Sequence, residues 1–411
     1  MGLRLSEYSF LLSEYSLLLV PLVAALVGWA TNWLAIQMSF YPVQFVGIGF
    51  LGWQGVIPRK AEKMAHICVD QTLQQFGDLN SVYRKLEPHK IVEHVVNLVS
   101  PRLDEYIDSM MYEVQPVLWD NLPLFVRSRI YRWAREQLPS RIEELVDDIG
   151  DDLDSLVDLK ALLSRQLQTN PDLMNRIFKE AGAVELRSVV NRGAWIGGLL
   201  GAALLPLWMR YPEPWALPVG GFLIGFVTNW LAINLIFAPL RPRRFLFWKV
   251  QGLFLRRQNE ISDVWARLVA EELITVELVA DAMVNGRQAT RTRAILQKHL
   301  RPMLDESLLL KVAAQVSVGM TGYADLKRVM NDKAVIATKD VFADPTFKKE
   351  RAPAVAAVLS EQMKSLKPEE FQNILRPAFR EEELQLMVVG GIFGAAAGLV
   401  QILGTTYLPL F

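Results

Sequence analysis

Four long runs of uncharged, mostly apolar residues constrain this chain more than any other feature. They cover residues 16–40, 193–209, 216–240 and 384–411. A helix of about 20 apolar residues crosses a bilayer core of about 30 Å. The pattern therefore predicts four transmembrane helices. The first run is preceded by a single basic residue, Arg4, and by Glu7 and Glu14, and no small-residue cleavage site ends it. We therefore expect it to act as an anchor and not as a signal peptide.

The stretches between these runs, residues 59–192 and 258–383, are rich in charge and have the pattern of helices. Their apolar residues recur at three- and four-residue spacing, and strand patterns are scarce. Asn170-Pro171-Asp172 has the composition of a helix start. The chain is therefore predicted to be an all-α membrane protein with four transmembrane helices and two large helical cytoplasmic regions.

An internal similarity links the two halves of the chain. Residues 27–42 read VGWATNWLAIQMSFYP and residues 224–239 read IGFVTNWLAINLIFAP, with nine of sixteen positions identical. The same offset of 197 residues aligns Arg59 with Arg256 and Pro171 with Pro368. The later spans match if a small deletion sets GGLLGAA at 197–203 against GGIFGAA at 390–396. Because each repeat contains two spans, the duplication is predicted to be parallel.

The distribution of basic residues predicts the orientation in the membrane. Two basic residues near span ends, Arg4 and Arg210, lie on one side. Twelve lie on the side of the soluble regions: Arg59, Lys60, Arg187, Arg192, Arg241, Arg243, Arg244, Lys249, Arg256, Arg257, Arg376 and Arg380. Since cytoplasmic loops carry an excess of Lys and Arg, we expect cytoplasmic soluble regions and both termini on the opposite side.

Small and polar residues share helix faces within the predicted spans. This set comprises Gly28, Thr31 and Asn32, their counterparts Gly225, Thr228 and Asn229, and the glycines Gly197, Gly201, Gly390 and Gly394. Small residues four apart let two helices approach closely, and an Asn side chain can link them by a hydrogen bond. The alternative interpretation is a polar ligand site near the bilayer midplane. No ionisable residue lies in any predicted span, so a proton relay is not expected.

Two connectors, residues 41–58 and 241–257, combine aromatic and basic residues. The candidate lipid contacts here and at the start of the first soluble region are Trp53, Arg59, Lys60, Arg241, Arg243, Arg244, Trp248 and Lys249. Aromatic side chains beside Lys and Arg suit the headgroup region of a bilayer, and the basic cluster favours anionic lipid. A re-entrant segment, or one that plugs the base of the bundle, is the alternative.

An acidic run, Glu143–Asp158, follows four arginines at 127, 129, 132 and 135. Ser140 and Glu143 have the spacing of a capping box, directly after Pro139. We expect two neighbouring helices, separated by a turn at Pro139-Ser140 and paired by opposite charge. A divalent-metal site is the alternative for the acidic run.

Composition and motifs narrow the function. The 44 acidic and 44 basic residues leave no net charge, which argues against nucleic-acid binding. Cys68 is the lone cysteine and there are four histidines, so neither metal nor cofactor is expected. The motifs of serine hydrolases, phosphate-binding loops, zinc proteases and dithiol enzymes are absent from the sequence. The chain is therefore predicted not to be an enzyme.

The paired TNWLAI motifs, each followed by Gln-Gly, resemble the YheB/YjiN-type family. The C-terminal segment LRPAFREEELQLMVVGGIFGAAAGLVQ adds to this resemblance. The family is a group of bacterial membrane proteins defined as a domain of unknown function. The resemblance implies a multi-pass protein of the bacterial inner membrane and carries no activity or catalytic residue with it.

The leading functional hypothesis is a membrane scaffold or tether whose helical soluble regions bind a partner or self-associate as a homo-oligomer. Membrane lipids, above all anionic ones, are the other expected partners. The alternative is a transport or lipid-handling protein with a path or groove at the interface between the repeats.

Overall fold

The computed structural model describes residues 2–48, 51–63, 66, 70, 79–210, 213–245, 248–305, 308–376 and 383–407. The chain forms two compact units. Unit 1 comprises residues 1–71, 167–265 and 363–411, and unit 2 comprises residues 72–166 and 266–362. The central parts of the two predicted soluble regions therefore fold together, as one unit.

Unit 1 contains the four apolar helices α1 (Gly2–Phe40), α12 (Ala183–Arg210), α13 (Ala216–Phe237) and α22 (Glu383–Tyr407). Its smaller elements are β1 (Val46–Ile48), β2 (Leu51–Trp53), α2 (Val56–Arg59), α11 (Pro171–Ala181), β3 (Arg243–Phe245), β4 (Trp248–Val250), α14 (Leu253–Arg256) and α20 (Pro368–Leu375). Helix α15 (Gln258–Glu272) begins in this unit and continues into unit 2.

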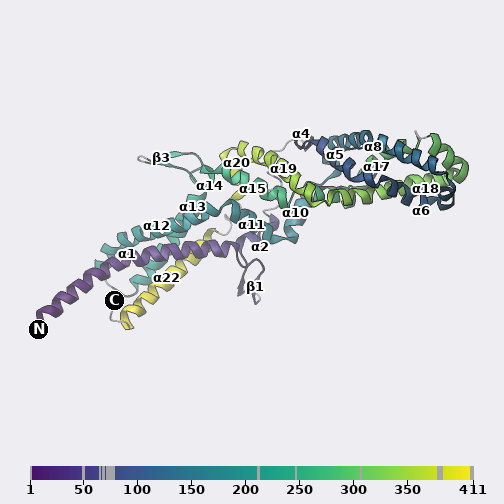
Figure 1. Ribbon diagram of the computed structural model, residues 1–411. Helices are drawn as coiled ribbons and strands as arrows, with labels where there is room; N and C mark the ends of the chain where they lie inside the picture. The colour runs from purple at the N-terminus through teal and green to yellow at the C-terminus, as the bar shows by residue number, and fades with distance from the viewer. Residues whose placement is uncertain are drawn as a thin grey trace. The chain divides into compact units, whose positions relative to one another are not determined.

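The four apolar helices of unit 1 pack as two close pairs, α1 with α12 and α13 with α22 (Figure 1). Each contains a segment long and apolar enough to cross a membrane: Val20–Phe40, Ala183–Arg210, Ala216–Phe237 and Glu383–Leu403. Apolar side chains of Ala24, Val27 and Ile224 meet where the pairs join. The predicted class, an all-α membrane protein with four spanning helices, is confirmed.

The spanning helices differ in length from the uncharged runs. Helix α12 begins at Ala183, ten residues before the predicted span, because no helix-breaking residue separates its charged first turns from the apolar part. Helices α1 and α13 end at Phe40 and Phe237. A proline follows two residues after each end, and the residue before a proline avoids the helical region.

Each connector contains a short antiparallel hairpin, which the sequence pattern did not predict. Strands β1 and β2 pair Val46 with Trp53 and Ile48 with Leu51. Strands β3 and β4 pair Arg243 with Val250 and Phe245 with Trp248. The hairpins are only three residue pairs long, too short for alternating hydrophobicity to identify them.

Unit 2 is built from helices. They are α4 (Leu79–Lys85), α5 (Pro88–Val99), a short 3₁₀ turn η1 (Ser100–Arg102), α6 (Leu103–Val114), α7 (Pro116–Asn121), α8 (Leu124–Asp151), α9 (Leu153–Leu156), α16 (Val276–Asn285), α17 (Ala289–Asp305) and α18 (Leu308–Phe342). Helices α10 (Leu159–Thr169) and α19 (Pro345–Ser365) begin in unit 2 and end in unit 1. Figure 1 shows α5, α8, α17 and α18 running beside one another.

Helix α8 contradicts the predicted turn at Pro139-Ser140. It continues through Pro139 from Leu124 to Asp151. The buried side chains of Ala134, Leu138 and Leu145 lie on one face across the proline. Burying this face offsets the cost of an internal proline, about 3 kcal/mol. The predicted pair of helices is therefore wrong.

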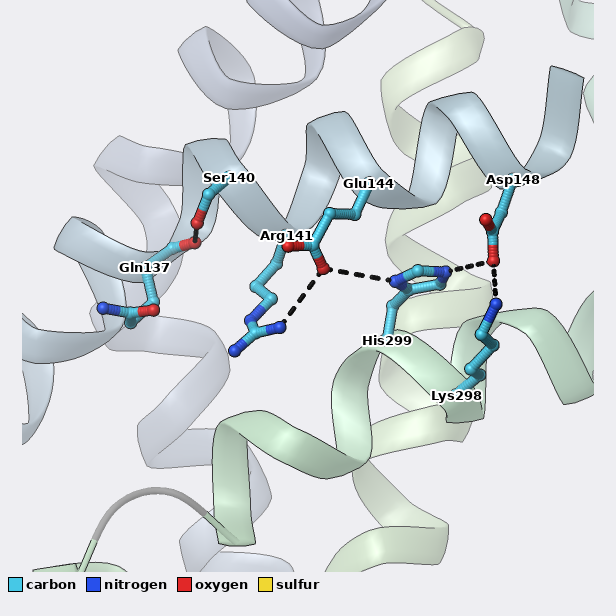
Figure 2. A network of polar contacts seen from close by, with 7 residues as sticks. All are labelled: Gln137, Ser140, Arg141, Glu144, Asp148, Lys298 and His299. Atoms are coloured by element: carbon cyan, nitrogen blue, oxygen red, sulfur yellow. Dashed lines mark hydrogen bonds and ion pairs between the residues drawn. The ribbon is translucent and has the colours of Figure 1, made fainter.

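Within the described residues, the acidic run does not pair with the four arginines at 127, 129, 132 and 135. Glu144 instead binds Arg141 of its own helix at 3.2 Å, and Asp148 binds another helix. Figure 2 shows Asp148 and Glu144 of α8 facing Lys298 and His299 of α17. Asp148 accepts a hydrogen bond from Lys298 and lies 2.7 Å from Nε2 of His299. The hydrogen bonds from Lys298 and His299 lower the pKa of the Asp148 carboxyl from its usual value. Arg135, in turn, binds Asp104 of α6 at 2.6 Å.

Candidate functional site: an apolar cavity in unit 2

The predicted polar residues of the spans lie at contacts between helices. Asn32 of α1 donates a hydrogen bond to the carbonyl oxygen of Val189 in α12, at 3.2 Å. Asn229 of α13 donates to the carbonyl oxygen of Leu386 in α22, at 2.8 Å. Both Asn side chains are buried. These bonds are the contacts that the packing interpretation requires, while each Asn Oδ1 atom lacks a hydrogen-bond partner among the described residues.

Thr31 and Thr228 bind their own helices. The Thr31 hydroxyl donates to the carbonyl oxygen of Val27 at 2.8 Å, and the Thr228 hydroxyl donates to that of Ile224 at 2.7 Å. Such bonds to the preceding turn satisfy a hydroxyl inside an apolar helix. The two threonines therefore need no ligand.

The glycines bring the backbones of paired helices into contact. A Cβ atom on Gly28 would collide with the carbonyl oxygen of Gly193, and one on Gly225 would collide with that of Gly390. Gly197 faces the backbone of Ala24, Gly201 faces its side chain, and Gly394 meets the backbone of Gly221. The contacts of Gly28 thus recur at Gly225 with the offset of 197 residues, and the deletion assumed between the later spans is wrong.

The predicted lipid-interface residues lie around the two hairpins of unit 1. Trp53 ends β2, and its indole donates to the carbonyl oxygen of Met38 at 3.2 Å. The Arg59 guanidinium lies 5.9 Å from the centre of that indole, and Lys60 follows directly after α2. Arg241 is exposed and binds Glu369 at 3.4 Å. Arg243, Arg244, Trp248 and Lys249 belong to strands β3 and β4.

Unit 2 contains a cavity of about 380 Å³. Most of its lining comes from α5, α6, α8, α16, α17 and α18, with single residues from α4, α9, α10 and α19, and nearly all of these side chains are apolar. Ligand pockets commonly have volumes of about 300–1,000 Å³ and predominantly apolar walls. The cavity therefore has the size and the lining of a site for an apolar ligand.

The cavity is long, as its lining along α8 shows. This helix contributes a stripe at three- and four-residue spacing: Ile130, Ala134, Leu138, Ile142, Leu145 and Ile149. At the helical rise of about 1.5 Å per residue, the stripe extends for about 28 Å. A volume of about 380 Å³ spread over that length is narrow, and suits an extended alkyl chain better than a compact ring system.

Flexible side chains and a few polar groups complete the lining. Five methionines line the cavity, Met110, Met111, Met283, Met303 and Met330, and methionine adapts its shape to irregular apolar surfaces. Lys333 is the one charged residue among the described lining residues, and it binds Glu113 at 3.1 Å. The buried hydroxyl of Thr292 lacks a partner within the described part of the chain.

Tyr83 closes the cavity wall where α4 meets α8. Its hydroxyl donates to the carbonyl oxygen of Val146 at 3.0 Å. Burial, together with the nearby Asp147 carboxylate, raises the pKa of the Tyr83 phenol well above its usual value. The phenol stays neutral at physiological pH and adds no charge to the lining.

The sequence did not reveal the cavity, although the lining of α8 was visible as an apolar helical stripe. A stripe of this kind is normally interpreted as the buried face of a helix in a filled core. Whether facing stripes meet or leave space depends on how residues far apart in the chain pack. The methionines and alanines of α16 and α18 were the available signal.

Comparisons with known proteins agree with a membrane protein. The chain is 24% identical over 151 residues to a UPF0754 membrane protein of Staphylococcus aureus strain MRSA252, covering 35% of this chain and 38% of that protein. A UPF0754 membrane protein of strain JH9 is 24% identical over 106 residues, covering 25% of this chain and 28% of the relative. The matches thus span 38% and 28% of these two relatives. No family model and no solved structure matches the chain.

These relatives are distant and belong to an uncharacterised group of membrane proteins. They support the predicted resemblance to an uncharacterised membrane family, while the YheB/YjiN designation stays a prediction.

Proposed function

We propose that this chain is a non-enzymatic lipid-handling membrane protein that holds the acyl chain of a lipid in the cavity of unit 2. The single observation that carries the proposal is the cavity itself, about 380 Å³ in volume and lined almost entirely by apolar side chains. The four apolar helices of unit 1 anchor the protein in the bilayer that supplies the lipid.

The energetic cost of an empty cavity supports this proposal. The cavity of about 380 Å³ is partly open to solvent. Its apolar walls therefore face water when no ligand is bound, which is unfavourable. An alkyl chain relieves this cost, since each buried CH₂ group contributes about 0.8 kcal/mol.

The hollow interior also favours lipid handling over the scaffold expected from the sequence. A scaffold gains stability from a filled core and has no use for a cavity of this length. Both halves of the chain line the site, as expected for a groove between repeats, but all of its lining residues belong to unit 2, so it is not a path past Asn32 and Asn229 in the spans. Asn32 and Asn229 then serve helix packing within the anchor.

A photo-crosslinking map tests the proposal. The full chain is reconstituted into vesicles that contain a phospholipid with a diazirine in its acyl chain, irradiated and digested for mass spectrometry. We expect adducts on the cavity residues Met283, Met303 and Met330 in addition to adducts on the spans. Adducts confined to unit 1 would contradict the proposal.

We also propose a location and an origin for this architecture. The protein lies in the bacterial inner membrane with unit 2 in the cytoplasm, and the basic connectors bind anionic headgroups. A parallel duplication produced its two pairs of spans. The excess of basic residues beside the soluble regions supports the orientation, and the recurrence of the Asn32 bond at Asn229 supports the duplication.

Thiol labelling checks the orientation. Single cysteines replace the exposed residues Glu213 and Asp332 in a chain whose native Cys68 is changed to alanine. An impermeant maleimide added to intact cells with a permeabilised outer membrane should label Glu213→Cys only. Labelling of Asp332→Cys under these conditions would reverse the orientation.

A further inference from the structure

The corner of unit 2 at which α6, α7 and α8 meet presents three large apolar side chains to solvent. Val117 is 73% exposed, Leu124 is 79% exposed and Phe125 is 75% exposed. These values match that of Leu199, an apolar side chain on the surface of the spanning helix α12, which is 74% exposed. Ile336 has the next most exposed large apolar side chain among the described residues of unit 2, at 55%. Val117 lies on α7, which ends three residues before Leu124 and Phe125 at the start of α8, and exposed apolar side chains grouped in one region mark interaction surfaces.

The corner is held in place by a buried aromatic residue. Trp119 of α7 is fully buried and donates from its indole nitrogen to Asp108 of α6 at 2.9 Å. Tyr131 of α8 donates to the same carboxylate. The Arg127 guanidinium lies 5.2 Å from the centre of the Trp119 ring. The three helices are therefore fixed to one another, and the exposed side chains belong to an ordered surface.

The charge of the corner is suited to an anionic partner. Asp120 accepts a hydrogen bond from Tyr112 at 2.9 Å and lies 4.0 Å from Arg127, while Glu113 binds Lys333. Two further basic residues of α8, Arg129 and Arg132, are exposed and have no ion-pair partner in the described parts of the chain. Asp120 and Glu113 thus each have a basic partner, and the exposed cations Arg129 and Arg132 lie on the helix that presents Leu124 and Phe125.

The corner adjoins one end of the cavity. Met111, which precedes the exposed Tyr112, lines the cavity, and so does Ile130, less than two turns after Leu124. The cavity stripe of α8 begins at Ile130 and runs away from this corner.

We propose that this corner docks on the surface of an anionic phospholipid bilayer, with Val117, Leu124 and Phe125 inserted among the lipids and Arg129 and Arg132 at the headgroups. Exposed apolar groups flanked by cations are the composition that binds such an interface. Docking brings the Met111 end of the cavity to the lipid. Only this last consequence rests on the proposed function.

An environment-sensitive fluorophore tests the docking directly. Nitrobenzoxadiazole is attached at Val117→Cys, or at Ile336→Cys as the control, in the full chain with Cys68→Ala, reconstituted in phosphatidylcholine nanodiscs. Vesicles of phosphatidylcholine and phosphatidylglycerol in equal parts are then added. We expect a blue shift and a stronger emission at position 117, and neither change at position 336.

Paired variants assign the contributions of the apolar and basic groups. Leu124→Ser with Phe125→Ser should weaken vesicle binding at least about tenfold, because two apolar side chains would no longer insert among the lipids. Arg129→Gln with Arg132→Gln should remove most of the preference for phosphatidylglycerol, and Ile336→Ser should change neither property. An unchanged spectrum at position 117, or a change that follows protein concentration without vesicles, would overturn the proposal, the latter in favour of self-association.

Discussion

Gly28→Ala and Gly225→Ala are each expected to destabilise the anchor of unit 1 markedly. A Cβ atom on Gly28 would collide with the carbonyl oxygen of Gly193 and lie 3.1 Å from Cα of Gly197. One on Gly225 would collide with the Gly390 carbonyl oxygen and lie 2.8 Å from its carbonyl carbon. Backbone cannot rotate away, so the helices must separate. We expect a loss of at least about 1–3 kcal/mol, the usual cost of overpacking, measured as thermal unfolding in detergent.

Gly220 supplies a matched control on the same helix as Gly225. The nearest atom to a Cβ at this position is Cδ1 of Leu204, at 3.8 Å, which is an ordinary contact distance. Gly220→Ala should therefore be neutral or stabilising by up to about 1 kcal/mol, the intrinsic helix preference for alanine. A Gly28→Ala protein as stable as Gly220→Ala would show that α1 and α12 do not pack through their glycines.

Removing bound lipid from the protein is expected to loosen unit 2 more than unit 1. Without lipid, the apolar walls of the cavity of about 380 Å³ face water, and the helices around it lose the apolar contacts that a ligand would supply. We therefore expect amide hydrogens of α8 and α17 to exchange faster after lipid extraction. Since exchange reports local opening free energy, exchange by mass spectrometry in detergent measures the effect helix by helix.

Filling the cavity with side chains should restore part of this stability. Ala280 and Ala337 both line the cavity. Burying a Phe side chain at each position would stabilise the folded protein by about 1.5–3 kcal/mol. Ala280→Phe with Ala337→Phe should therefore slow exchange in the delipidated protein. The same change at the exposed Ala357 of α19 should not. Equal exchange with and without lipid would contradict a ligand-filled cavity.

The parts of the fold that depend on local sequence could be predicted, and the parts that depend on distant packing could not. Uncharged runs predicted the spans, and Pro171 predicted the start of α11, because both follow from residues close in the chain. Pro139 was misinterpreted as a turn because burial on both sides of it, which a local pattern does not show, keeps α8 intact.

The candidate site shows the same division more sharply. The spacing of Gly28 and Asn32 showed that they share one helix face. It did not show that they contact Gly193 and Val189 of α12. The cavity needs helices from residues 79–159 and 274–355 side by side, and no local pattern brings those segments together. Its lining residues look like ordinary core positions in the sequence.

The amount of lipid that stays bound to the purified chain tests the central claim most directly. Lipid extracted from the wild-type protein, from Ala280→Phe with Ala337→Phe, and from Ala357→Phe is quantified after identical purification and detergent exchange. The claim predicts lipid that resists extraction from the wild type and from Ala357→Phe, and a large loss from the filled-cavity variant. Equal retention by all three proteins would contradict it, because the lipid would then be bound outside the cavity of unit 2.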